Sequence, residues 1–545
     1  MPDKTNLPVT VDLFSMTLIW PLRLHTTADR RNEGLVGDWA AEMCRGQIWK
    51  AKDPYDRERA PNSNEAYSEF VYFEPYVQRF LYGDRRDGSL PHATNFRLIQ
   101  RDDVKRVAVT LLKGDAALLL DVIRLQLYLF DTGVVLMVIE VSASNWSFDQ
   151  TLTFQNFFRR SYPPYWSDHE LQTTHPEARP GQCPELVEWQ KADGEPVGDL
   201  STYQFYSRFK ESAYKNRLPA ISAHWSSLLL PMQAYVGNAP APGEWLYQHL
   251  GDERIPYMSY WAVDHPERIT PGEWARLTFA DGPGSSEFPY AKIFLTGLQA
   301  DYRYDRFWDV PADYVPSLEA RAAEIEYKTR YVCAGYAFSV VGSSNDFNFK
   351  HPEWGVLAHY RAHYFQLGLI AHLQKASLLV IADRIAAEVR KLPDSEDRTG
   401  YEAIEMDLTA FFDRYWFHDV SAQEQGRELF RWWTRHLRLA ELSQQVRDET
   451  QFVNQVLRTR SDTRRNDFSA KLTKLATLAI GPALVASFWG MNIVTDSVRY
   501  WLREAGSMPR PKWSDAWEFG AFLLPSLLAW VLLKNWADRS RKGRQ

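Results

Sequence analysis

The tripeptide Gly490-Met491-Asn492 offers polar oxygen atoms that could bind a metal ion. Asn492 offers a neutral amide oxygen that can accept hydrogen bonds from the water shell of a cation, and Mg²⁺ gives up that shell reluctantly. Gly490 has no side chain, so its backbone carbonyl can be approached closely. Met491 is expected to pack on a neighbouring helix and not to coordinate. A ring of such amides would therefore recognise a divalent ion in its hydrated form.

Two apolar segments near the C-terminus must position this tripeptide. Residues 472–493 carry Lys474 as their only charge and would form a helix of about 33 Å, close to the hydrocarbon thickness of a bilayer. Residues 516–533 form a second run, in which Glu518 is the only charge. Two buried helices of a soluble protein are the alternative, but the charges cluster at the ends of both runs. The sequence predicts two transmembrane helices joined by an external loop, 494–515.

Basic residues flank the outer ends of both runs. Six Arg and Lys residues lie between Arg458 and Lys474, and five more lie between Lys534 and Arg544. Cytoplasmic flanks of membrane helices are enriched in Lys and Arg, so both termini are predicted to be cytoplasmic. The expected location is the cell (inner) membrane, as a multi-pass protein. One pair of spans is too small to enclose a pore, so several copies would have to assemble around an axis.

The first apolar run resembles the pore helix of the CorA family of divalent metal-ion (Mg²⁺) channels and transporters. Leu472-Thr473, Ala476-Thr477, Pro482 and Phe488-Trp489 precede Gly490-Met491-Asn492 in the family's order, with the proline one residue late. The resemblance implies a CorA-like funnel, a homopentamer, and Gly490, Met491 and Asn492 as the selectivity filter. It implies Mg²⁺ as the transported ion and as a candidate regulatory ion. No organic cofactor and no catalytic residue are indicated.

Further pore-lining positions follow from helical spacing. Below Ala483, steps of three or four residues place small and apolar side chains on one face. The candidate pore-lining residues are Asn466, Ser469, Leu472, Ala476, Ile480 and Ala483. Such side chains suit a constriction that closes by dewetting, whereas Asn466 and Ser469 would meet water at the cytoplasmic end. For any one of these positions, contact with a neighbouring helix is the alternative.

A long helix is predicted to connect the pore with the rest of the chain. Ser421 and Glu424 form a capping-box pattern, and no proline follows before Pro482. Apolar residues recur at helical spacing in between. One helix from Ser421 to Asn492 would be about 108 Å long. Its cytoplasmic part, 421–471, would form the stalk.

Two shorter helices, 353–392 and 399–416, are predicted to flank the stalk. His359 and His363 lie four residues apart on the first of them, a spacing that can bind zinc. No carboxylate completes an HExxH motif, and no third ligand is evident in the sequence. The two histidines are therefore expected to be packed or surface residues.

The N-terminal part is predicted to be a mixed α/β cytoplasmic domain. Residues 8–25 and 105–112 are predicted strands, and Asp131-Thr132-Gly133 marks a hairpin between strands 123–130 and 134–141. No phosphate-binding glycine loop and no nucleophile motif occur in the sequence, so no enzymatic activity is expected.

The predicted organisation follows the chain in seven segments. They are a cytoplasmic α/β domain at 1–350, with 150–320 as a candidate insertion, helices flanking the stalk at 351–420, the stalk at 421–471, the pore helix at 472–493, the external loop at 494–515, the second transmembrane helix at 516–533 and a basic cytoplasmic tail at 534–545.

Composition limits the partners. The net charge is −6, and the three cysteines, Cys44, Cys183 and Cys333, form no CxxC pair. A mildly acidic chain is not typical of a nucleic-acid binder, and isolated cysteines do not make a disulfide framework or a cysteine-based zinc site. The expected partners are the lipid bilayer, further copies of the chain and a cytosolic small-molecule ligand.

Two departures from the family pattern leave the function open. Residues 1–350 form a longer cytoplasmic part than is usual in the family, and Met508-Pro509 is followed by Arg510 where the common form has Met-Pro-Glu. A basic vestibule would not concentrate a divalent cation. The first hypothesis is a divalent-cation channel gated by its cytoplasmic domain, with Mg²⁺ as the expected ion. The alternative is a CorA-like membrane effector gated by a cytosolic signal, such as a nucleotide messenger in a stress or CRISPR-associated anti-phage response. Zinc or proton-coupled transport is a third hypothesis.

Overall fold

Two units make up the chain, residues 1–447 and residues 448–545, and each is described by itself. The computed structural model describes residues 8–25, 35–54, 64–83, 96–167, 179–198, 201–202, 206–237, 244–280, 329–391, 399–490 and 531. The first unit is an α/β domain, and the described part of the second unit is helical.

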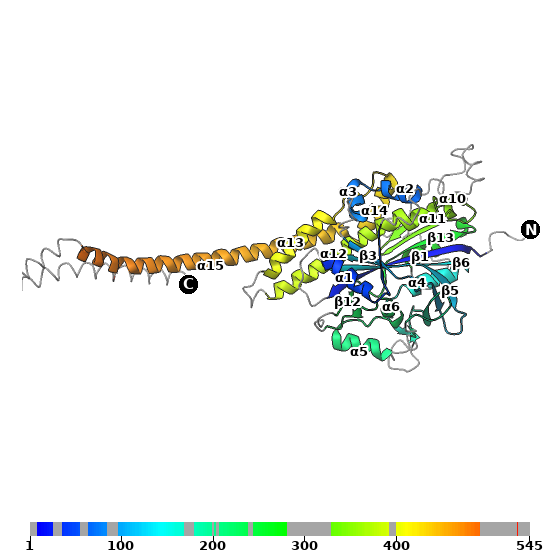
Figure 1. The fold of residues 1–545 in the computed structure, drawn as a ribbon, viewed down its shortest axis with the longest axis horizontal. Helices are drawn as coiled ribbons and strands as arrows, with labels where there is room; N and C mark the ends of the chain where they lie inside the picture. Colours follow the sequence, from blue (N-terminus) through cyan, green and yellow to red (C-terminus); the bar gives the residue numbers. More distant parts are fainter. Residues whose placement is uncertain are drawn as a thin grey trace, which may run out of the picture. The chain divides into compact units, whose positions relative to one another are not determined.

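A 13-stranded sheet organises the described part of the first unit (Figure 1). Its main path runs β10-β9-β4-β5-β6-β1-β13-β15-β14, with β2-β3 joined to β5 and β11-β12 joined to β1. The strands of this sheet are β1 (Thr10–His25), β2 (Lys50–Lys52), β3 (Phe96–Gln100), β4 (Arg106–Thr110), β5 (Leu118–Phe130), β6 (Val134–Ser147), β9 (Leu186–Gln190), β10 (Ser201–Thr202), β11 (Gln233–Ala234), β12 (Leu246–His249), β13 (Tyr257–Val263), β14 (Arg330–Ala334) and β15 (Ala337–Ser343). β7 (Trp166–Ser167) and β8 (Arg179–Pro180) form a separate pair.

β1 is the central strand of the sheet. It runs antiparallel to β6 from the pair Thr10–Ser147 to the pair Arg23–Val134. On its other edge it runs antiparallel to β13, and β13 continues the sheet in parallel with β15. The sheet is therefore mixed, and its long central strands are covered on both faces.

Side chains of the central strands alternate between two apolar cores because successive residues of a strand point to opposite faces. On β6, Met137 and Ile139 belong to one core, whereas Leu136 and Val138 belong to the other. Burial on both faces explains why this strand is a continuous apolar run in the sequence.

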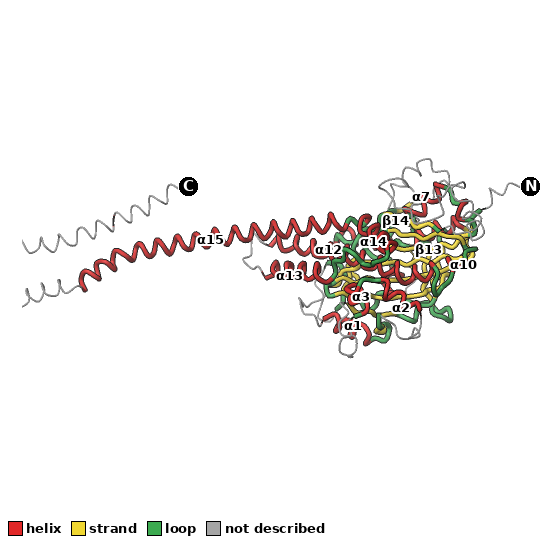
Figure 2. Tube along the Cα trace, turned by 90° about the horizontal axis from the view of Figure 1, so that it is seen from above, coloured by secondary structure: helices red, strands yellow, loops and turns green. Residues whose placement is uncertain are grey.

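Helices cover both faces of the sheet. The first core includes residues of α1 (Leu35–Arg45), α4 (Phe148–Phe158), α6 (Ala223–Leu228) and α7 (Pro271–Phe279). The second includes residues of α2 (Asn64–Tyr72), α3 (Pro75–Tyr82), α10 (Phe347–Lys350), α11 (Val356–His359), η3 (Tyr360–Tyr364), α12 (Phe365–Lys391), α13 (Thr399–Arg414) and α14 (Glu424–His436). Figure 2 shows α14 beside the strands, and α13 beside α12. Two further helices of the first unit are α5 (Tyr206–Asn216) and η2 (Pro266–Arg268), and α15 (Leu439–Gly490) runs from the first unit into the second.

A buried ion-pair cluster joins the sheet to the second helical layer. Glu140, on β6, is fully buried and accepts hydrogen bonds from Ser15 Oγ at 2.8 Å and from Arg361 Nε, on η3, at 2.7 Å. Arg124 Nε, on β5, lies 2.9 Å from the second carboxylate oxygen. The Arg124 guanidinium lies 4.0 Å from the centroid of the Phe365 ring. The helix adopts a π-helical turn at this contact.

Several predicted elements are confirmed. β1 and β4 correspond to the predicted strands 8–25 and 105–112. β5 and β6 form the predicted hairpin around Asp131-Thr132-Gly133. The predicted helix 353–392 exists as α11, η3 and α12 in succession, and α13 corresponds to the predicted helix 399–416.

The predicted single helix from Ser421 to Asn492 is wrong. α14 ends at His436, and α15 begins at Leu439 after a break at which Arg438 has φ 55°. The predicted capping box is wrong as well. Gln423 precedes the first helical turn without a side-chain cap, and the Ser421 hydroxyl donates to the carbonyl of Tyr72. A residue in the left-handed region cannot continue an α-helix, so the segment consists of two helices.

Candidate functional site

The predicted pore residues lie on α15 as far as the structure describes them. Gly490 is the last residue of α15, whereas Met491 and Asn492 lie outside the described residues. The six predicted pore-lining positions, Asn466, Ser469, Leu472, Ala476, Ile480 and Ala483, all fall within the helix. Ser469 and Leu472 are exposed in the single chain, and α15 continues through Pro482 without a break.

Within the described part of the chain, one helical segment is long and apolar enough to cross a bilayer, and it is Val356–Arg390. Its most apolar window is 83% buried within the first unit, so it is explained as a core helix under the sheet. Most side chains of the predicted pore helix 472–493 lie outside the described residues, so this finding does not bear on that prediction. The predicted second span, 516–533, lies outside the described residues apart from Val531.

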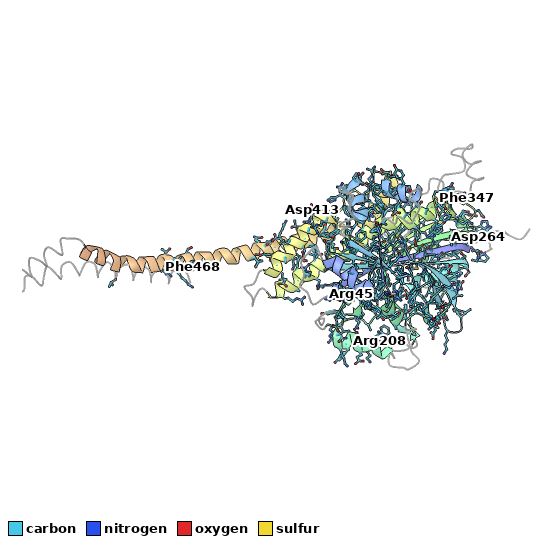
Figure 3. The ribbon with its side chains drawn as sticks, viewed as in Figure 1. Arg45, Arg208, Asp264, Phe347, Asp413 and Phe468 are labelled. Carbon is cyan, nitrogen blue, oxygen red and sulfur yellow. The ribbon has the colours of Figure 1, made fainter. Side chains whose placement is uncertain are left out.

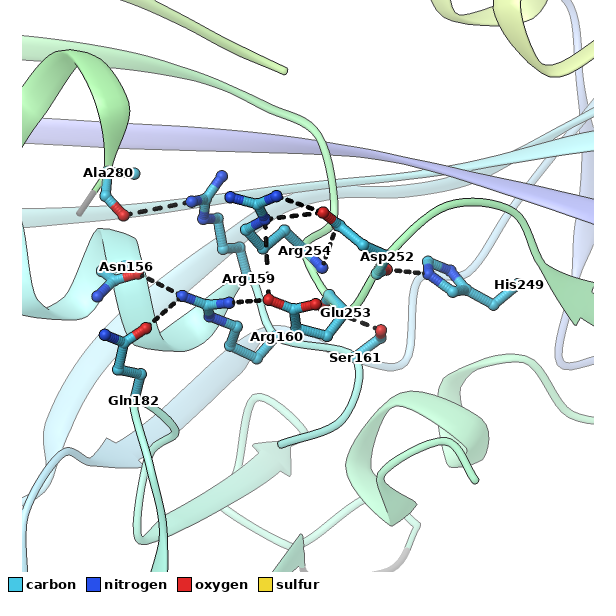
Figure 4. A network of polar contacts seen from close by, with 10 residues as sticks. All are labelled: Asn156, Arg159, Arg160, Ser161, Gln182, His249, Asp252, Glu253, Arg254 and Ala280. Atoms are coloured by element: carbon cyan, nitrogen blue, oxygen red, sulfur yellow. Dashed lines mark hydrogen bonds and ion pairs between the residues drawn. The ribbon is translucent and has the colours of Figure 1, made fainter. Parts of the chain in front are cut away.

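A second candidate site, which the sequence had not singled out, lies at the end of α4 (Figure 4). Ser147 caps the start of this helix by accepting a hydrogen bond from the backbone of Gln150, and buried phenylalanines hold the helix on the sheet. Arg159 and Arg160 follow the last helical turn directly, and both are almost completely buried. Buried arginines are rare unless they are paired, so their contacts decide what the site can do.

Among the described residues, no carboxylate is in hydrogen-bonding contact with Arg159. It is 4% exposed, its Nη2 donates to the carbonyl of Ala280 at 3.2 Å, and its guanidinium carbon lies 5.3 Å from the centroid of the Tyr257 ring. Its Nε has no acceptor within the part of the chain that the structure describes. Burial lowers the pKa of Arg159 to about 10, which leaves the side chain a cation at neutral pH.

Arg160 is held by three acceptors. Its Nη2 donates to Asn156 Oδ1 at 3.0 Å and to Gln182 Oε1 at 2.6 Å, and its Nη1 pairs with the carboxylate of Glu253. Gln182 reaches this position with φ 52°, an uncommon backbone conformation for a residue other than glycine. Arg160 Nε and Asn156 Nδ2 have no acceptor from any described residue.

The acidic partners come from the loop between β12 and β13. Arg254 Nε donates to Asp252 Oδ2 at 3.0 Å, and the backbone amide of Ser161 donates to the carbonyl of Glu253 at 2.8 Å. His249, at the end of β12, supports this loop. Trp20 Nε1 is a donor only and lies 2.6 Å from His249 Nδ1, so the proton of the imidazole is on Nε2 and is donated to the carbonyl of Asp252.

The site carries a net positive charge. Three arginines, Arg159, Arg160 and Arg254, face two carboxylates, those of Asp252 and Glu253. Three buried donors, Arg159 Nε, Arg160 Nε and Asn156 Nδ2, have no acceptor in the described ranges of the chain. Excess positive charge with unused donors is the arrangement that binds an anion such as a phosphate or a carboxylate.

The predicted histidine pair on α11 and η3 is packed in the first unit. The rings of His359 and His363 lie 4.7 Å apart between centroids, and the ring of His363 lies 4.4 Å from that of Tyr72. Burial lowers the pKa of both histidines, to about 4 for His359. No group of three potential metal ligands occurs among the described residues.

Comparison with known proteins supports the predicted resemblance in the C-terminal part of the chain. Residues 415–535 match the family model described as CorA-like Mg²⁺ transporter protein, which confirms a CorA-like region there. No curated protein matched the chain. Among solved structures, the CorA magnesium transporter from Methanocaldococcus jannaschii is similar at 12% identity with a TM-score of 0.22, over 53% of this chain and 93% of that chain. The full-length CmaX protein is similar at 13% identity with a TM-score of 0.21, over 53% and 94%. With TM-scores this low, neither structure carries an argument about the fold of this chain.

Proposed function

We propose that this chain, which belongs to the CorA family through its residues 415–535, forms a membrane channel for divalent cations, with Mg²⁺ as the expected ion. The observation that carries the proposal is the family match over the segment that contains α15 and Gly490-Met491-Asn492. The family model is described as a Mg²⁺ transporter, which makes transport and not catalysis the expected activity.

In the proposed channel, residues 472–493 and 516–533 cross the inner membrane, and both termini are cytoplasmic. Several copies, five by the family resemblance, surround one pore. The side chains of Asn492 form a ring of neutral oxygens at its outer end, and Gly490 and Met491 complete the filter. Phe468 and Leu472 support assembly, because both are large apolar side chains exposed on the isolated α15. Exposed apolar residues of this kind are the surface that lipid or further copies would cover.

Mg²⁺ flux into proteoliposomes with an internal fluorescent reporter tests the channel. Asn492→Ala is expected to alter uptake, because it removes the oxygen that accepts from the hydrated ion. Asn345→Ala, at an exposed asparagine of the first unit, is the matched control and is expected to leave uptake unchanged. An assembled oligomer that conducts no divalent cation under any condition would contradict the proposal.

The arginine site supports a second candidate function, in which an anionic cytosolic ligand gates the pore. Nucleotides carry phosphates that match a buried cationic site with unused donors. Substitution of Arg159 distinguishes this gating function from a purely structural role of the site. Burial of a cation without a contacting carboxylate costs stability, so a purely structural site would tolerate Arg159→Met or gain stability from it.

A flux assay with added ATP, as a probe of the ligand class, distinguishes the two functions. If the site binds a phosphate-bearing ligand, the flux through wild type changes when the nucleotide is added. Arg159→Met is expected to lose this change in flux, while its unfolding midpoint is unchanged or higher. Arg45→Met, at an exposed arginine of α1, is the control that keeps the response. Equal flux in wild type and Arg159→Met, with and without nucleotide, would exclude a gating role for ATP at this site.

A further inference from the structure

We propose that the carboxylate of Glu253 is an internal substitute for a ligand at the arginine site, and that a terminal phosphate group binds there in exchange for it. The inference rests on the proposed anion-binding role of this site. It adds which anion the site selects and which side chain that anion displaces. It is carried by the contacts of Arg160 and by the charges around it (Figure 4).

The donors that would bind the phosphate are buried side chains. Arg159, Arg160 and Asn156 are 4%, 5% and 1% exposed, and each has a donor without an acceptor among the described residues. Asn156 Oδ1 accepts from Arg160 Nη2 at 3.0 Å, which fixes the orientation of the amide and leaves Nδ2 as a donor. Buried donors without acceptors are unfavourable, so an anion that supplies oxygen atoms at this place is stabilised.

Glu253 is the one acidic acceptor in contact with Arg160 in the described part of the chain. It pairs with Nη1, whereas Nη2 donates to the neutral side chains of Asn156 and Gln182. The side chain of Glu253 is 21% exposed, and Arg254 Nε lies 3.8 Å from the same carboxylate oxygen. Figure 4 shows this carboxylate between the two guanidinium groups. A rotation toward solvent and Arg254 would therefore release Nη1 for a ligand.

The backbone around Glu253 does not need to move in this exchange. The backbone amide of Ser161 donates to the carbonyl of Glu253 at 2.8 Å, and the Ser161 hydroxyl donates to the same carbonyl at 3.1 Å. The backbone amide of Ile255 donates to the carbonyl of Arg159 at 2.9 Å. These hydrogen bonds hold the chain on both sides of Glu253, so only its side chain has to rotate.

The charges of the site select a group with two negative charges. Arg254 is neutralised by Asp252, which accepts from its Nε at 3.0 Å and from its backbone amide at 2.9 Å. Glu253 alone then faces the charges of Arg159 and Arg160. Once Glu253 has turned away, a terminal phosphate with about two negative charges at neutral pH neutralises both arginines. A phosphodiester or a carboxylate, with about one negative charge, leaves one arginine uncompensated.

Isothermal titration calorimetry of the full-length protein in a mild detergent tests the exchange. The probes are AMP, inorganic phosphate and cyclic AMP, because the first two carry a terminal phosphate and cyclic AMP carries the same nucleoside on a diester. Wild type is expected to bind AMP and inorganic phosphate, and to bind cyclic AMP about tenfold more weakly or worse. Tighter binding of AMP than of inorganic phosphate would identify a phosphate monoester as the ligand, and the reverse order would identify free phosphate.

Substitutions of Glu253 test its role as the internal anion. Glu253→Gln is expected to lower the Kd for AMP about tenfold, since the ligand no longer competes with the ion pair. Glu253→Asp shortens the side chain and is expected to lower the Kd by a smaller factor. Arg160→Met is expected to lose AMP binding. Arg45→Met, at an exposed arginine on α1 (Figure 3), and Glu195→Gln, at an exposed partner of Lys191, are the matched controls with wild-type affinity.

Circular dichroism and the unfolding midpoint of each variant check that the first unit is folded. A lower midpoint of Glu253→Gln that AMP restores supports the exchange, because a ligand stabilises the state that binds it. The inference is overturned if folded Glu253→Gln and Glu253→Asp bind AMP no more tightly than wild type does. It is also overturned if cyclic AMP binds as tightly as AMP. Exchange that leaves Mg²⁺ flux unchanged supports the inference and contradicts only the gating role of the site.

Discussion

Glu140→Gln is expected to destabilise the first unit by about 3–5 kcal/mol, the usual cost of removing one partner of a buried ion pair. The carboxylate of Glu140 is the only acidic group in hydrogen-bonding or ion-pair contact with both Arg124 and Arg361 among the described residues. The two arginines are 17% and 28% exposed, so water cannot fully replace the lost partner. Two charge-assisted contacts of roughly 1.5–3 kcal/mol each sum to about 3–6 kcal/mol, which overlaps this range.

The pH dependence of this effect has a defined sign. Burial alone would raise the pKa of Glu140, but Arg124 and Arg361 more than offset burial and hold the pKa below its ordinary value. A carboxyl group with a lowered folded pKa stabilises the fold above its unfolded pKa and loses that contribution as the pH falls through the folded value. The difference between wild type and Glu140→Gln is therefore expected to be largest at neutral pH and to shrink in acid.

Guanidinium unfolding of the full-length protein in detergent, followed by tryptophan fluorescence, measures the loss. Trp20, Trp225 and Trp261 are fully buried in the first unit and report on it. Glu195→Gln removes an exposed partner of Lys191 and is the control, with no expected change in the midpoint. If Glu140→Gln unfolds at the wild-type midpoint, or if its loss of stability does not depend on pH, the ion-pair cluster does not hold the sheet to the helices.

Three further changes have defined outcomes. Arg438→Gly is expected to raise the stability of the first unit by about 1 kcal/mol in the same unfolding assay, because glycine adopts the observed φ of 55° without strain; an Arg438→Val variant as stable as wild type would contradict this. Gly342→Ala is expected to cost about 1–3 kcal/mol, since a Cβ there would lie 2.4 Å from the Phe349 ring. Burial lowers the pKa of His372 to about 3, so protonation favours the unfolded chain, and about 2 kcal/mol is lost between neutral pH and pH 5. His372→Leu is expected to remove that part of the acid sensitivity, and equal pH slopes for both proteins would contradict the assignment.

The strands of the sheet could be predicted where nearby residue types determine the backbone conformation. Gly133 has φ 79°, the conformation that the turn after Asp131 requires, so the hairpin was evident from residue types. The strands on either side proved longer than predicted. Residues 142–147 are mostly polar and resemble a loop, yet they continue β6 because Ser147 and Ser144 pair with Thr10 and Leu13 of β1. Such pairing partners are more than 130 residues away and leave no local signal.

The break before α15 shows the same limit in a helix. Ser421 and Glu424 have the spacing of a capping box. The Ser421 hydroxyl instead donates a hydrogen bond to the carbonyl of Tyr72, which is distant in the sequence. Leu437 and Leu439 are both buried, and Arg438 between them is exposed in the left-handed conformation. Packing of both leucines in the same core fixes this geometry. A pattern of helical spacing continues through the break and cannot reveal it.

The candidate sites differ in how they could be found. Gly490-Met491-Asn492 is contiguous, so its position after an apolar run was enough to single it out. Arg159 and Arg160 are adjacent in the sequence, but they form a site only through their contacts with Gln182, Glu253 and the carbonyl of Ala280. These partners come from three other segments. Two neighbouring arginines after an apolar helix were the only local signal of this site.

A signal bound in the first unit would have to reach the proposed pore through an element that has two arrangements. α15 begins in the first unit and ends at Gly490, so it is the covalent connection available for this purpose. The residues before it are fixed, because α14 is anchored on α12 through Trp433 and Leu437 is buried. The backbone of Arg438 is the one strained link between α14 and α15 in the described chain. A left-handed arginine costs about 1–2 kcal/mol relative to a helical one, so joining the two helices through this residue would recover energy of that order. A ligand that binds one arrangement more tightly by a similar amount could therefore shift the balance between a broken and a continuous helix.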